Sequence, residues 1–155
     1  EIISTTIINS FLNHNNIESV WLDARDCIKT DSNYRGGNVQ WAETQKNILN
    51  KIQKGKINVT QGFIGSDKNN FSTSLGREGS DYSAAIFAYS LNGESLTIWK
   101  DVPGVLNGDP KVFNNSRLLD QISYSEAIEL AFYGASVIHP KTLQPLQIHR
   151  QLQKL

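Results

Sequence analysis

The stretch SLGREGSDYSAA, residues 74–85, gathers side chains that suit anion binding. Its two glycines permit positive φ angles and the close approach of a ligand to the backbone. Small helix-forming residues follow at once, so a helix beginning at Ser80 directs its free N–H groups toward the loop before it. Arg77 adds a planar fork of donors that grips a carboxylate or a phosphate. The stretch therefore predicts a site for an anion.

Two further stretches place ligand-binding residue types directly after predicted strands. QGFIGS, residues 61–66, follows INVT, and KDVPGVLNGDPK, residues 100–111, follows LTIW. Ligands of parallel α/β sheets bind beyond the carboxyl ends of the strands. Gly62 and Gly65 permit close approach to the backbone.

The second stretch carries charges that suit a nucleotide or another phosphate compound. Lys100 and Lys111 can neutralise phosphate, while Asp101 and Asp109 can accept ribose hydroxyls, orient a lysine or lie near a magnesium ion. Each residue alone is equally typical of a solvated loop or a turn. Together they favour a site for an anionic small molecule, but their spacing alone does not name it.

Composition narrows the class of protein. The 155 residues, 39% hydrophobic and 19% charged, suit one globular domain. Lys plus Arg equal Asp plus Glu at 15 each, so no global charge favours nucleic-acid binding. One cysteine, Cys27, and the lack of a secretory signal or long apolar run indicate the cytoplasm and no membrane association.

Several familiar sites are missing from the sequence. It contains no Walker loop, no dinucleotide fingerprint and no paired CxxC. The three histidines, His14, His139 and His149, lack the spacing of metal ligands, so we expect no metal site built from protein side chains.

Helix and strand patterns alternate along the chain and must position these residues. Apolar Ile3, Ile7 and Phe11 predict an amphipathic first helix. Strands separated by helices of this length indicate right-handed crossovers. The predicted class is α/β, with a mainly parallel sheet and helices on both faces. Strands are expected at 17–24, 57–65, 95–101 and 136–140, and helices at 41–55, closed by Gly55, at 80–93, and at 123–135, with a Ser123/Glu126 capping box and Gly134 at the end.

Four motifs together resemble aspartokinase. VTQGFIGS, SLGREGSDYSAA, IWKDVPGVLNGDPK and ISYSEAIELAFYGASVIHPKTLQP follow one another in the order and near the spacing of that family. The resemblance covers roughly residues 20–148 and corresponds to the second half of the catalytic domain, in the amino-acid-kinase fold.

The resemblance implies transfer of the ATP γ-phosphoryl group to the β-carboxylate of L-aspartate, with Mg²⁺. The product is 4-phospho-L-aspartate, on the route to lysine, threonine and methionine. Catalytic roles fall on Arg77, which would hold the substrate carboxylate, and on Asp81, which with Ser80 would order the substrate and catalytic lysines. Gly62, Phe63 and Gly79 would complete the aspartate pocket.

The resemblance also assigns a nucleotide side, with Asp101 near the ribose or base and Asp109 and Lys111 near the phosphates. Four positions depart from the family pattern. Glu78 replaces a glycine, Leu106 a tyrosine, Lys111 an arginine and Ser136 a lysine. Because serine cannot neutralise phosphate, either another cation such as Lys100 or Lys141 would supply that charge or this side would bind ATP less tightly. The expected nucleotide-side residues are Lys100, Asp101, Leu106, Asp109, Lys111, Ser136 and Val137.

The sequence also lacks family features. It has no methionine, no KFGGTS-like segment and no regulatory ACT domain, so residues 1–155 are expected to be the C-terminal part of a kinase domain. Such a piece would fold, self-associate as a homo-oligomer and fail to catalyse. Two alternatives stay open: another amino-acid kinase, acting on glutamate, acetylglutamate or uridylate, or a non-catalytic homologue that binds aspartate or a nucleotide.

Overall fold

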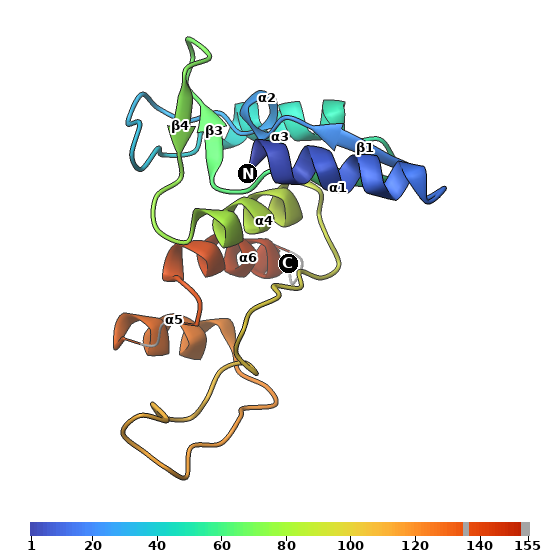
Figure 1. The fold of residues 1–155 in the computed structure, drawn as a ribbon. Coiled ribbons are helices and arrows are strands. Elements are labelled where there is room, and N and C mark those ends of the chain that lie inside the picture. Colours follow the sequence, from blue (N-terminus) through green and yellow to red (C-terminus); the bar gives the residue numbers. More distant parts are fainter. Residues whose placement is uncertain (135–136, 153–155) are drawn as a thin grey trace.

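Helices outnumber strands in the computed structural model, which describes residues 1–134 and 137–152. In Figure 1, α4 lies between the strands and helices of the first half of the chain and α6, and α5 lies beyond α6. The elements are α1 (Ile2–His14), β1 (Ser19–Leu22), α2 (Ala24–Cys27), α3 (Trp41–Lys51), β2 (Ile57–Thr60), β3 (Ile64–Ser66), β4 (Ser72–Ser74), α4 (Gly79–Ser90), α5 (Tyr124–Phe132) and α6 (Pro140–Leu152).

The strands of the described residues form two small sheets. β1 and β2 pair in parallel, with Ser19 opposite Ile57 and Leu22 opposite Thr60. β3 and β4 form an antiparallel pair in which Ile64 lies opposite Ser74. The α/β class is confirmed, and the parallel pairing that we predicted holds for the first sheet.

The strand predicted at 95–101 is wrong, because residues 95–100 adopt no regular structure. The part of the predicted 136–140 strand that the structure describes is also not a strand, and Pro140 begins α6. β-branched and aromatic residues favour a strand only where a neighbouring strand takes their backbone hydrogen bonds. Within the described ranges, the stretch around 95–119 offers only the isolated bridge between Leu106 and Leu118.

The helix predictions are largely confirmed. α5 carries the expected capping box, in which the Ser123 hydroxyl accepts from the Glu126 backbone and the Glu126 carboxylate accepts from the Ser123 backbone. Gly134 has a φ of +108° just after the helix. α3 ends at Lys51, earlier than predicted, and Gly55 lies in the following turn with a φ of +80°.

The core lies between the β1–β2 side of the molecule and α4. α4 contributes Tyr82 and Ile86, four residues apart and therefore on one helix face. They pack in one cluster with residues from the first sheet, α2, α3 and the loop before α4: Leu22, Cys27, Ile28, Ile48 and Leu75. This cluster fixes α4, and with it the loop that precedes it.

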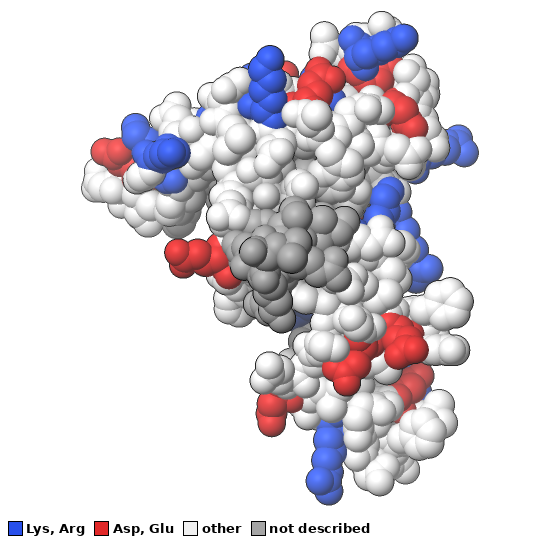
Figure 2. Space-filling view, turned by 180° about the vertical axis from the view of Figure 1, so that it is seen from behind, with Lys and Arg blue, Asp and Glu red and all other residues white. Residues whose placement is uncertain are grey.

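The surface carries both charge signs and some apolar side chains. Lysine and arginine are interspersed with aspartate and glutamate on the face shown in Figure 2. In α1, Ile3, Ile7 and Phe11 are each more than half exposed. No described helix combines the length and apolar character needed to cross a bilayer.

Candidate functional site

The glycine turn, residues 61–63, packs directly against the arginine loop, residues 75–78, and against the first turns of α4. The Phe63 N–H donates to the Ser83 hydroxyl at 2.9 Å, and the Leu75 N–H donates to the Phe63 carbonyl at 2.8 Å. A Cβ on Gly62 would lie 2.8 Å from the Cα of Ser80, so only glycine fits this approach. Two motifs that are separate in the sequence thus form one surface.

The arginine loop reaches α4 through left-handed backbone. Gly76 has a φ of +83° and Glu78 a φ of +52°. Glycine adopts this region freely, whereas glutamate is strained there by about 1 kcal/mol. α4 then begins at Gly79, where a Cβ would lie 2.8 Å from the Phe63 ring. Glu78, which replaces the glycine of the family pattern, therefore keeps the left-handed loop conformation but lowers the stability of the protein.

Arg77 is exposed and makes no hydrogen bond or ion pair with any residue that the structure describes. Ser80, also exposed, lies in the first turn of α4 beside it. A guanidinium without a protein partner, next to the positive end of a helix dipole, is suited to bind a carboxylate in two-point fashion. The structure thus places these two predicted site residues next to each other at the start of α4, and their binding of an anion stays a prediction.

Asp81 is paired with a cation from a distant part of the chain. The Lys100 ammonium lies 2.6 Å from its Oδ2 atom. The close contact with Asp81 is the largest cause that raises the pKa of Lys100 above the ordinary lysine value, and the carboxylates of Glu78 and Asp101 add to it. Lys100 therefore stays charged and links the arginine loop to the second stretch of predicted site residues.

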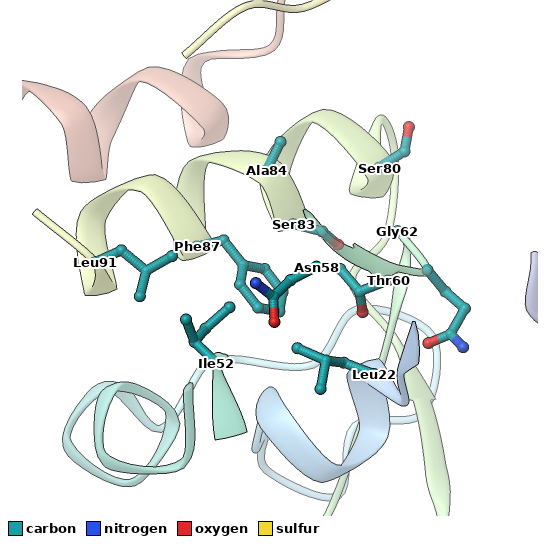
Figure 3. Close-up of a pocket in the computed structure, with 11 residues that line it drawn as sticks. Leu22, Ile52, Asn58, Thr60, Gly62, Ser80, Ser83, Ala84, Phe87 and Leu91 are labelled. Carbon is teal, nitrogen blue, oxygen red and sulfur yellow. The ribbon is translucent and has the colours of Figure 1, made fainter. Parts of the chain in front are cut away.

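A cavity of about 420 Å³ adjoins the glycine turn and α4 (Figure 3). Ser80 and Gly62 lie at one end of it and Leu91 at the other, with Phe87, Ile52 and Leu22 forming apolar walls.

Gln61, fully buried, also lines this cavity. Its Oε1 atom accepts from the Ala24 N–H at 2.6 Å, while its Nε2 atom has no hydrogen-bond partner among the described residues. The cavity is thus mainly apolar with a few polar groups, as small-molecule sites are.

A second, smaller cavity of about 190 Å³ contains two of the predicted nucleotide-side residues, Lys100 and Val137. Lys100 is the charged residue of the lining, and the other lining residues are apolar side chains and one glycine. The remaining lining residues are Ile98, Val102, Pro103, Gly104, Val105 and Ile138.

The other predicted nucleotide-side residues do not line this cavity. Asp101, Asp109 and Lys111 are exposed, and the Asp109 carboxylate accepts from the Lys111 backbone within its own turn. Leu106 pairs with Leu118 in the loop that extends beyond α5 in Figure 1. Ser136 lies outside the described residues.

Lys141 is one of the two lysines that the sequence offered for neutralising phosphate, whereas the sequence assigned no role to Ser83 or Gln61. Lys141 lies with its ammonium 3.5 Å from the Leu75 carbonyl oxygen and 4.8 Å from the centre of the Tyr82 ring. It therefore contacts the arginine loop and not the second cavity. Ser83 holds the glycine turn, and Gln61 reaches the first cavity. Gln61 directly precedes Gly62, and this adjacency is the sequence signal that could have found it.

Known proteins with similar sequences include aspartokinases. The chain is 36% identical over 149 residues to lysine-sensitive aspartokinase 3 of Escherichia coli K12, covering 94% of this chain and 33% of that protein. It is 40% identical over 148 residues to the bifunctional aspartokinase/homoserine dehydrogenase of Buchnera aphidicola, covering 94% of this chain and 18% of that protein. This chain thus spans at most about a third of the length of these relatives.

The fold is also similar to that of a solved aspartokinase structure. The crystal structure of E. coli aspartokinase III in complex with aspartate and ADP superposes with a TM-score of 0.88 at 34% identity, over 94% of this chain and 33% of the other. The model of the amino acid kinase family matches residues 1–152. With nearly the whole chain matched in sequence and the described fold matched in structure, the chain belongs to the amino acid kinase family.

Proposed function

We propose that this chain is part of an aspartokinase and supplies the surface that holds L-aspartate for phosphorylation by ATP. The observation that carries the proposal is the arginine loop, in which an exposed Arg77, without a partner among the described residues, stands at the start of α4 against the glycine turn. The relatives support the same substrate, since the aspartokinase III structure contains aspartate and ADP.

Arg77 would bind one carboxylate of L-aspartate, with Ser80 and the first N–H groups of α4 beside it. Gly62, Phe63 and Gly79 would shape the pocket, because their close packing brings the glycine turn against the start of α4. Phosphoryl transfer depends chiefly on alignment and on neutralising charge, so a rigid clamp on the acceptor serves the reaction directly.

The nucleotide would lie toward the second cavity, where Lys100 provides a fixed positive charge and Val137 an apolar surface. The stretch through Asp101, Asp109 and Lys111 would close over it from the exposed loop.

Magnesium would enter with the phosphates. Among the described residues no group of three or more His, Cys, Asp and Glu side chains is arranged to hold a metal ion. Mg²⁺ in kinases commonly binds through substrate phosphates with one or two carboxylates, and Asp101 and Asp109 are available for that. The ion would supply charge neutralisation of the transferred phosphoryl group.

The test is Arg77→Ala in the polypeptide that carries this segment at full length, assayed with L-aspartate, ATP and magnesium. We expect kcat/KM for aspartate to fall by about 2–4 kcal/mol in transition-state terms, with poor rescue by Arg77→Lys, because lysine lacks the planar fork. Arg117→Ala, an exposed arginine in the loop beyond α5, is the matched control. Near-normal turnover of the Arg77→Ala protein would refute the clamp.

The same assay separates the alternatives. A non-catalytic homologue would bind aspartate or ADP in calorimetry and yield no acyl phosphate at any enzyme concentration. Another amino-acid kinase would phosphorylate a different acceptor in the same coupled assay.

A further inference from the structure

The ion pair between Lys100 and Asp81 connects two parts of the molecule that the proposed function uses separately. Asp81 belongs to the first turn of α4, beside the arginine loop, and Lys100 lies on the wall of the second cavity. The two charges are 2.6 Å apart, and their side chains are only 13% and 26% exposed. In such partly shielded surroundings each charge interacts more strongly with its partner than it would at an open surface.

Each member of the pair is also placed to meet a ligand. An anion entering the second cavity meets the Lys100 ammonium, since the other lining residues are uncharged. Asp81 follows Ser80, which lines the first cavity, in the first turn of α4, so the ammonium group of an amino acid held at the arginine loop would approach its carboxylate. The two charges pair with each other in this structure, so either ligand must compete with an existing ion pair.

We propose that the two ligands bind by exchanging the partners of this ion pair, an inference that rests on the proposed function. The phosphates of the nucleotide bind the Lys100 ammonium, and the α-ammonium group of the amino acid binds the Asp81 carboxylate. When the nucleotide binds alone, Asp81 loses its partner, and when the amino acid binds alone, Lys100 loses its partner. When both ligands bind, each of the two charges has a new partner. Nucleotide and amino acid therefore bind with positive cooperativity, and the effect is the same in both directions.

The experiment measures binding by calorimetry in the 155-residue chain, with ADP and L-aspartate added alone and each in the presence of the other. In the wild type we expect each ligand to tighten the other by about fivefold or more. In Lys100→Met we expect ADP to bind about tenfold more weakly and L-aspartate more tightly, because Asp81 is then free, with the cooperativity lost. Lys100→Arg should retain the cooperativity.

Asp81→Asn should have the opposite effects: we expect tighter binding of ADP, weaker binding of L-aspartate and no cooperativity. Opposite changes in the two affinities distinguish exchange from a structural role, which would weaken both ligands together. Lys56→Met is the matched control, because the Lys56 side chain lines neither cavity and forms an exposed ion pair with Glu18, with its Nζ 3.5 Å from Oε2. It should leave both affinities and their coupling unchanged.

Different binding results would refute partner exchange and the proposed function. If both ligands bind but Lys100→Met shifts both affinities in the same direction, or the cooperativity survives the substitution, partner exchange is wrong and the proposed function stands. If the wild-type chain binds neither ADP nor L-aspartate, the proposed function fails for this chain, and partner exchange fails with it.

Discussion

Residues 19–90 and residues 91–139 build their parts of the site in different ways. The first region contains the buried cluster around Ile28 and Ile86, and its two motifs contact each other through glycines. In the second region no described residue is buried, and turns and one capped helix provide the local structure. Core packing therefore shapes the proposed aspartate side, whereas the proposed nucleotide side is held by local hydrogen bonds.

Removing one core side chain is the strongest test of this contrast. Ile86→Ala should lower the free energy of unfolding by about 2–5 kcal/mol, because it removes buried methyl groups from the face of α4 that positions the arginine loop. The matched change Val112→Ala, in the exposed loop, should cost less than about 0.5 kcal/mol. Urea denaturation measures both. Equal losses would mean that the second region has a core of its own.

The contact between the glycine turn and α4 is the next largest effect. Gly62→Ala should cost about 1–3 kcal/mol of stability, since its Cβ would press on the Ser80 backbone at 2.8 Å, and should weaken L-aspartate binding by displacing the arginine loop. Gly36→Ala is the control, because nothing lies within 4 Å of its added Cβ. Unchanged thermal unfolding and unchanged aspartate affinity in Gly62→Ala would show that the two motifs are not rigidly packed.

The smallest effect concerns the local structure of the second region. The Ser123 hydroxyl, and then its backbone N–H, lower the pKa of Glu126 below the usual glutamate value. A lowered folded-state pKa means that this contribution to α5 is present above the unfolded pKa and is lost as the pH falls through the folded pKa. NMR titration of the Glu126 carboxyl should show its pKa rising toward the ordinary value in Ser123→Ala. An unchanged pKa would mean that another contact holds α5.

Several features were predictable from residue types because they depend on neighbours in sequence. The Ser123/Glu126 capping box, the positive φ of Gly134 and the helix after the arginine loop need only local backbone geometry. The candidate anion site was likewise visible, since Arg77 and its flanking glycines lie within a few positions.

The strand at 95–101 failed for the complementary reason. Its apolar and β-branched residues satisfy the local pattern, but a strand exists only when another segment accepts its hydrogen bonds, and none does so among the described residues. The residues of a strand do not by themselves identify the segment with which it pairs.

The sequence by itself determined the α/β class, the capped helices and the arginine loop, because periodicity, capping and turn preferences act over a few residues. Only the tertiary structure decided that the Gly62 backbone meets Ser80 and that Lys100 pairs with Asp81. It also decided that Lys141 contacts the arginine loop through the Leu75 carbonyl. Those contacts join residues 18, 19 and 66 positions apart, and their distances are set by how α4 packs on the core and on α6, which no local pattern encodes.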